Sequence, residues 1–238
     1  MIIARLTAAV FAVAAVLALS SPAWAGANEG IQAYLAGDYA KAWSELKPAA
    51  DRGNADAQYY VGVMYNHGQG VARDYTKAVA WYRRAAEQGH TQAQFNLGFL
   101  YYNGAPGITP DPFEAGRWLL AAAEGGIAYA QALVGRMYAE GRGLPLDIGK
   151  AFSWTRKAAE AGIPSAQFDL ALMYTTGEGA DVDLVAAYTW FTIVTERSYP
   201  GAWINRDLVG QALRPEDRAK AEAAARAWLA ANPRPETG

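Results

Sequence analysis

The residues of this chain that could carry out chemistry are few, and their spacing does not favour catalysis. The only histidines are His67 and His90, and the chain contains no cysteine, which excludes disulfides, thiolate metal sites and cysteine nucleophiles. Neither histidine has a second metal ligand or a nucleophile at a useful spacing. The sequence therefore predicts no catalytic residue, no metal site and no cofactor, and we expect that the protein is not an enzyme.

Five aspartates recur in register and could be read as catalytic or metal-binding carboxylates. Each lies four residues before an alanine that opens an apolar helical face. Aspartate is among the preferred N-cap residues there, because its side chain accepts hydrogen bonds from the first free main-chain N–H groups of the helix. We therefore interpret all five as helix caps: Asp38, Asp74, Asp111, Asp147 and Asp183.

Three Gly-x-Gly pairs could suggest a phosphate-binding loop. Each pair follows a predicted helix and no strand, so the structural context of a dinucleotide-binding fingerprint is missing. Glycine in the left-handed region at the end of a helix explains the pairs without a ligand. The pairs are Gly68/Gly70, Gly141/Gly143 and Gly177/Gly179.

The elements that carry these residues follow an internal repeat. Gln58 recurs as Gln94, Gln131 and Gln167, in steps of 36, 37 and 36 residues. Tyrosine and tryptophan recur at nearly the same steps, as Tyr65, Tyr101, Tyr138, Tyr174 and as Trp81, Trp118, Trp154, Trp190. A constant period of this size, carried by bulky residues, is typical of a solenoid.

Each repeat contains two apolar faces with helical spacing. The first is carried in the first full repeat by Ala57, Val61, Met64 and Tyr65, and the second by Ala78, Trp81, Tyr82, Ala85 and Ala86. These offsets of three, four, seven and eight residues fit helices and exclude strands. Glycine recurs in the middle of the first helix, at Gly62, Gly98 and Gly135, where a Cβ atom is expected to strike the partner helix.

The first 25 residues have the organisation of a signal peptide. A short basic segment, Met1–Arg5, precedes the apolar run Leu6–Leu19, and Ala23-Trp24-Ala25 fits the small-x-small rule for cleavage before Gly26. The apolar run of about 14 residues is shorter than the roughly 20 that a membrane-spanning helix needs. We expect a soluble periplasmic or secreted protein with no stable membrane insertion after cleavage.

The repeat resembles the Sel1-like repeat, a relative of the tetratricopeptide repeat. The matching residues of the first full repeat are Ala55, Ala57, Gln58, Val61-Gly62, Tyr65, Gly68, Gly70-Val71, Asp74, Ala78, Trp81-Tyr82, Ala85-Ala86 and Gly89. The resemblance implies an all-α, right-handed superhelix of about five helical hairpins with a C-terminal capping helix. It also implies that the protein acts as an adaptor in bacterial envelope processes or signalling. It does not imply that the protein catalyses a reaction.

The resulting division of the chain has five parts. They are a signal peptide (1–25), a degenerate N-terminal repeat (26–53), four Sel1-like repeats (54–198), a degenerate repeat with a capping helix (199–231) and a disordered tail (232–238).

The predicted function is that of an adaptor or scaffold that binds another envelope protein, or a peptide segment of one. The formal net charge is −2 and no run of Lys or Arg stands out, so nothing favours nucleic acid as a partner. The alternatives are an envelope protein that binds cell-wall glycan and a hydrolase of the secreted, β-lactam-binding repeat type. Those secreted relatives are rich in cysteine, and this chain has none.

Aligning the repeat with tetratricopeptide repeats predicts a concave binding face on the first helix of each hairpin. The predicted partner-binding residues are Tyr59, Val63, Asn66, Phe95, Phe99, Tyr102, Arg136, Phe168 and Leu172. These positions vary between repeats while the packing positions do not, as expected for recognition. In the alternative interpretation, Phe95, Phe99 and Phe168 are buried by the coiling of the superhelix and belong to the core.

Overall fold

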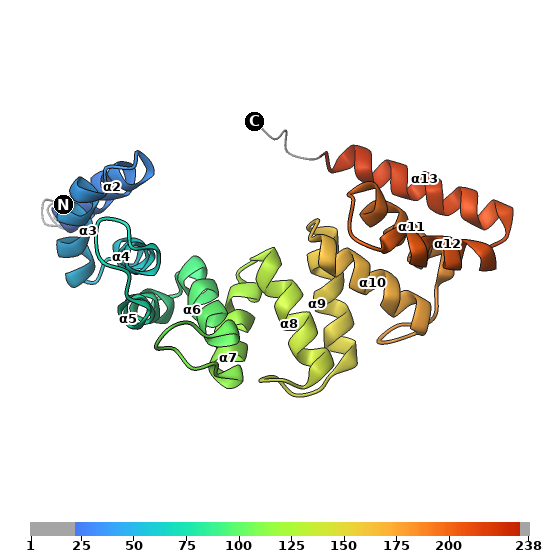
Figure 1. Cartoon of the computed structure of the whole chain (residues 1–238), viewed down its shortest axis with the longest axis horizontal. Coiled ribbons are helices and arrows are strands. Elements are labelled where there is room, and N and C mark those ends of the chain that lie inside the picture. Colours follow the sequence, from blue (N-terminus) through green and yellow to red (C-terminus); the bar gives the residue numbers. More distant parts are fainter. Residues whose placement is uncertain (1–21, 234–238) are drawn as a thin grey trace, which may run out of the picture. The chain divides into compact units, whose positions relative to one another are not determined.

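The computed structural model describes residues 22–233, and this part of the chain contains twelve α-helices and no strand. The chain divides after Pro110 into two compact units, each described by itself. The first unit contains α2 (Pro22–Leu35), α3 (Tyr39–Asp51), α4 (Ala55–His67), α5 (Tyr75–Glu87) and α6 (Thr91–Asn103) (Figure 1). The second contains α7 (Pro112–Glu124), α8 (Ala128–Glu140), α9 (Ile148–Glu160), α10 (Pro164–Thr176), α11 (Leu184–Glu196), α12 (Ala202–Ala212) and α13 (Pro215–Ala231).

Helices that follow one another in the sequence pack as hairpins within each unit. In the first unit α2 contacts α3, and α4 contacts α5; in the second, α8 contacts α9 and α10 contacts α11 (Figure 1). The predicted all-α fold of stacked helical hairpins is thus confirmed. No helix between residues 22 and 233 is long and apolar enough to cross a bilayer. Most of the predicted signal peptide (residues 1–21) and the predicted tail from residue 234 lie outside the described residues.

All five repeated aspartates cap helices, as predicted. Each begins the second helix of a hairpin, and its carboxylate accepts from a main-chain N–H of the first turn, for example from Lys77 N to Asp74 at 2.9 Å. These hydrogen bonds hold the pKa of Asp74 and Asp147 below the usual value for aspartate. The aspartates are therefore parts of the scaffold.

The repeated glutamine joins one hairpin to the next. In every full repeat its side-chain N–H donates to a main-chain carbonyl near the end of the preceding helix, at 3.1–3.2 Å. The pairs are Gln58–Ala50, Gln94–Ala86, Gln131–Ala123 and Gln167–Ala159. Each of these carbonyls also accepts the main-chain N–H of the glycine three residues later, as Ala50 does from Gly53 at 3.0 Å. The glutamine therefore adds a second hydrogen bond at the helix end, and this one joins two hairpins.

Glycine is required in the middle of α4 and α8 by close helix packing. A Cβ atom on Gly62 would lie 2.6 Å from Cδ1 of Tyr82, and one on Gly135 would lie 2.5 Å from Oγ1 of Thr155. The prediction that a side chain there would strike the partner helix is confirmed at both positions. Left-handed glycines end α4, α8 and α10, as predicted from the Gly-x-Gly pairs.

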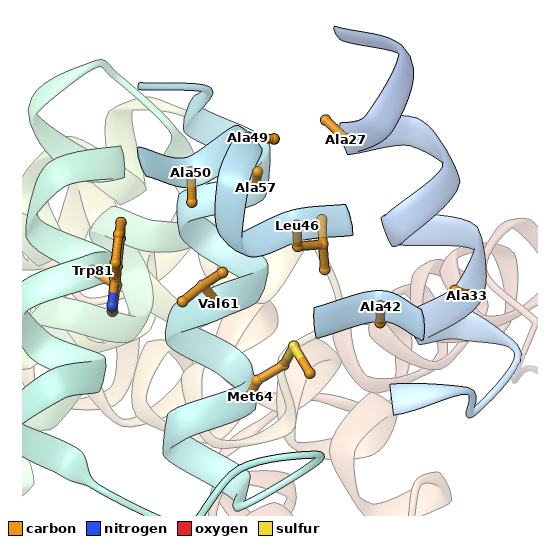
Figure 2. Close-up of a cluster of buried hydrophobic side chains, with 10 residues drawn as sticks. All are labelled: Ala27, Ala33, Ala42, Leu46, Ala49, Ala50, Ala57, Val61, Met64 and Trp81. Carbon is orange, nitrogen blue, oxygen red and sulfur yellow. The ribbon is translucent and has the colours of Figure 1, made fainter. Parts of the chain in front are cut away.

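The core of each unit combines alanines with a few large side chains. In the first unit, Leu46, Val61, Met64 and Trp81 fill the space between helices that alanines allow to approach closely (Figure 2). In the second, the buried rings of Tyr188 and Phe191 lie among Ala171, Ala187 and Ala221. The end of α13 is held by Arg197, whose Nη2 donates to the main-chain oxygen of Asn232 at 2.7 Å and whose guanidinium stacks on Trp228.

Candidate functional site

A cleft of about 320 Å³ lies in the first unit, between α4, α5, α6 and the turn after α6; we call it the first cleft. Its lining residues share one property, which is that none carries a charge at neutral pH. They are Asn66, Tyr75, Tyr82, Asn96, Phe99, Leu100, Gly104, Ala105 and Pro106. The polar side chains of the wall are therefore the amides of Asn66 and Asn96 and the phenols of Tyr75 and Tyr82, and the other side chains are apolar.

Tyr82 is the most buried of the polar residues that line the first cleft, with an exposed fraction of 0%. Its hydroxyl is buried, and Asn96 is the hydrogen-bonding side chain beside it. Burial strongly raises the pKa of Tyr82, and the nearby amide of Asn96 only partly opposes this. Asn96 lies beside the hydroxyls of both Tyr82 and Tyr59 and stays half-buried at the cleft wall.

Helix α6, which carries Asn96 and Phe99, is positioned by His90. The Nδ1 atom of His90 accepts the main-chain N–H of Ala93 at 3.2 Å and so caps the helix. Its ring stacks on Tyr59 at 4.6 Å, and its Nε2 atom lies 3.4 Å from Oδ1 of Asp56. Burial lowers the pKa of His90 and Asp56 opposes this, so the neutral, capping form is favoured. His90 thus holds the start of α6.

A second cleft of about 230 Å³ lies in the second unit, between α8, α9, α10 and the turn after α10. It is lined by Gly135, Arg136, Ala139, Glu140, Thr155, Asp169, Leu172, Met173 and Glu178. Arg136 Nη2 lies 3.9 Å from Oδ2 of Asp169, at the limit of an ion pair. Burial raises the pKa of Asp169, with the positive charge of Arg136 acting in the opposite direction. This second cleft is charged where the first is neutral.

The two clefts occupy the same place in the repeat. Six positions of the first cleft return in the second, each shifted by 73 residues, which is the length of two repeats. The pairs are Asn66/Ala139, Tyr82/Thr155, Asn96/Asp169, Phe99/Leu172, Leu100/Met173 and Ala105/Glu178. One framework therefore builds the same hollow twice, with different side chains around it.

The predicted concave-face residues divide between these clefts and the packing around them. Asn66 and Phe99 line the first cleft, and Arg136 and Leu172 line the second. Phe99 is 45% exposed. Half-buried positions are Tyr59, Phe95, Tyr102 and Phe168. Phe168 packs on the buried ring of Phe191, with ring centroids 5.5 Å apart, so it shares in the core.

Val63 requires a correction, because it was expected on an exposed face and is only 7% exposed. Helix α2 contacts α4 in addition to α3, so α4 has neighbours on more sides than a simple hairpin provides. Val63 is therefore a packing residue.

Sequence reasoning missed Asn96 and Asp169, which occupy the same position of the repeat, one residue after Phe95 and Phe168. The position reads Tyr60, Asn96, Leu133 and Asp169 along the chain. It varies as strongly as the positions that were selected, so the same criterion could have found it.

Among the described residues, no group of three His, Asp or Glu side chains is placed to hold a metal ion. Ser44 and Lys47 have the Ser-x-x-Lys spacing of some serine hydrolases. However, Ser44 Oγ donates to the main-chain oxygen of Lys41 at 2.8 Å, and Lys47 Nζ lies 2.6 Å from Asp51 Oδ2. Both side chains are engaged along α3 and not with each other.

The comparison with known families gives four consecutive matches to the Sel1 repeat, at residues 55–90, 91–127, 128–163 and 164–193, together more than half of the chain. The chain belongs to the Sel1 repeat family. The predicted resemblance is thus confirmed. Sel1 repeat proteins generally mediate protein–protein interactions as scaffolds, and the family is typically not enzymatic.

Two solved Sel1 repeat structures are similar to this chain. A Sel1 repeat protein from Oxalobacter formigenes is 32% identical, covers 85% of this chain and 82% of its own, and gives a TM-score of 0.70. The protective antigen c5321 of uropathogenic Escherichia coli is 27% identical with a TM-score of 0.54, over 81% of this chain and 49% of that protein. None of the curated proteins matches this chain.

Proposed function

We propose that this Sel1 repeat protein is an exported adaptor of the bacterial envelope that binds another protein at its repeat clefts. The observation that carries the proposal is the pair of equivalent clefts. Both are built by two consecutive first helices, the second helix between them and a turn, yet one is neutral and the other charged. A scaffold that keeps its framework and varies its lining suits recognition of different parts of a partner.

The proposed location rests on the sequence of the leader. A basic start, an apolar run too short for a membrane anchor and a small-x-small motif before Gly26 favour export and cleavage. The intact mass of protein recovered from the periplasm tests this. We expect a chain that begins at Gly26, whereas a full-length product in the membrane fraction would refute export.

Capture of the partner from an envelope extract tests the adaptor role. The extract should be used with and without muramidase, because a glycan ligand is then lost and a protein ligand is kept. We expect one protein to be captured by the wild type in both extracts, with clearly less captured by Phe99→Ala or Leu172→Ala. Capture that is unaffected by changes in either cleft would contradict the proposal.

A further inference from the structure

We propose that the first cleft binds an uncharged, extended segment of a partner protein. The amides of Asn66 and Asn96 would hold the main chain of that segment, and Phe99 would receive one of its apolar side chains. This inference rests on the proposed adaptor function and names the ligand of one of its two sites.

The charge of the ligand follows from the lining. No residue around the first cleft is charged, whereas the equivalent cleft of the second unit contains Arg136, Glu140, Asp169 and Glu178. A charged group that enters a neutral cleft loses part of its hydration and gains no opposite charge, which is unfavourable. The segment at the first cleft is therefore uncharged.

The hydrogen-bonding groups point to a peptide main chain. A side-chain amide offers two N–H donors and one acceptor oxygen, which matches a peptide group that both donates and accepts. Asn66 comes from α4 and Asn96 from α6, so the amides approach the cleft from two helices. A helical segment would already use its main-chain groups internally, but an extended one leaves them free.

The buried Tyr82 hydroxyl supports this role for Asn96. Buried polar groups are nearly always paired, and the polar side chain beside this hydroxyl is the Asn96 amide, which lowers the pKa of Tyr82 as a hydrogen-bonding neighbour does. The amide oxygen of Asn96 can accept from Tyr82 while its N–H groups stay available to donate to a main-chain carbonyl of the ligand.

The remaining wall favours a peptide over a saccharide. Phe99 is 45% exposed, and Leu100, Ala105 and Pro106 continue the carbon surface. An apolar side chain buries area against such a wall. A sugar ring carries hydroxyl groups on most of its carbons, and several of them would face carbon without a partner.

The test begins with a displayed library of random peptides, selected on the full chain. The selected peptide is synthesised, and its dissociation constant is measured for the wild type and for variants. Asn96→Leu should weaken binding by roughly tenfold or more, while Gln92→Leu, an exposed change on the same helix, should stay within about twofold. Asn96→Asp keeps the shape of the side chain and replaces the leucine variant if that one does not fold.

Two further measurements are specific for the main chain and for the absence of charge. Replacing single amides of the peptide by esters should weaken binding roughly tenfold at one or two positions, since each ester removes one N–H donor. Raising the salt concentration from about 50 to about 500 mM should change the affinity by less than about twofold. Strong salt dependence, or equal effects of Asn96→Leu and Gln92→Leu, would overturn the inference.

The outcomes separate this inference from the adaptor function. If no peptide is selected but the wild type still captures an envelope protein, the adaptor function stands and the inference is wrong. If muramidase-released saccharides bind instead, and Asn96→Leu abolishes that binding, the first cleft is a glycan site and the inference is overturned. If neither peptide, saccharide nor envelope protein binds, both proposals fail.

Discussion

Replacing Gly135 by alanine tests whether α8 and α9 pack as closely as the structure shows. The new Cβ atom would lie 2.5 Å from Oγ1 of Thr155, 3.1 Å from the Thr155 main-chain nitrogen and 3.3 Å from the main-chain oxygen of Ala151. A hydroxyl can rotate away, but the two main-chain atoms belong to α9 and move only with the helix. The substitution therefore pushes the two helices apart.

The expected cost combines two opposing effects. Overfilling a packed contact costs about 1–3 kcal/mol, and the two main-chain contacts favour the upper end. Alanine in place of glycine favours the helix itself by about 1 kcal/mol. The free energy of unfolding should thus fall by about 2 kcal/mol, and the melting temperature by roughly 4–8 °C for a chain of this size.

Gly149→Ala in the same hairpin is the matched control. The only atom that its Cβ would approach is Oδ1 of Asp147, at 3.6 Å, which is an ordinary contact. The only expected effect is then that alanine favours the helix more than glycine does, which should raise the free energy of unfolding by up to about 1 kcal/mol. Urea denaturation followed by circular dichroism measures both variants. If the Gly135 variant is as stable as the wild type, or if both variants change stability in the same direction, α8 and α9 do not pack as closely as described.

Three further predictions concern helix α6, the core and the first cleft. Acidification below about pH 6.5 should lower the melting temperature, because His90 has a folded-state pKa below its usual value and its capping, neutral form is lost as pH falls. His90→Asn can cap α6 through its amide oxygen and does not titrate, so it should remove that part of the pH dependence. If the melting temperature of this variant depends on pH as that of the wild type does, His90 does not cap α6 in the way described. Ala115→Leu, at a fully buried site, should cost about 1–3 kcal/mol in thermal or urea unfolding, against roughly 0.5 kcal/mol or less for the exposed Glu124→Gln. Phe99→Ala should cost less than about 2 kcal/mol because the ring is 45% exposed, and a loss of about 3–5 kcal/mol would assign it to the core.

The scaffold could be predicted from the sequence because its signals are local and repeated. An aspartate four residues before an alanine face can cap only one helix, and Asp74 and Asp147 do so with nearly the same geometry. The repeated glutamine shows the limit of such reasoning. Its period was evident, but its hydrogen bond to a carbonyl of the preceding helix depends on the spacing between hairpins, which one repeat alone does not contain.

The clefts were harder to predict because they need residues from three helices at once. Tyr82 was interpreted only as a packing residue, yet it also lines the first cleft. Asn96 follows the predicted position Phe95 by one residue, and its half-buried side chain reaches the cleft wall from there. The prediction that Val63 is exposed was wrong because α4 contacts α2, α3 and α5, and the pattern within α4 alone does not reveal how many helices surround it.

The two clefts, whose equivalent residues lie 73 positions apart, are lined mainly by residues other than those that cap and join the helices. Asp74 and Asp147 cap, and Gln58 and Gln131 tie the hairpins together, without lining either cleft. Mutations at the exposed or half-buried lining positions, such as Asn66, Asn96 and Phe99, can therefore accumulate while the framework stays folded, whereas Tyr82 and Gly135 also serve the packing. The binding preference of one unit could be grafted onto the other by exchanging a few side chains: Asn66→Ala, Asn96→Asp and Phe99→Leu would give the first cleft three residues of the second. Duplication of a repeat then provides a spare recognition position, free to diverge while the original keeps its ligand.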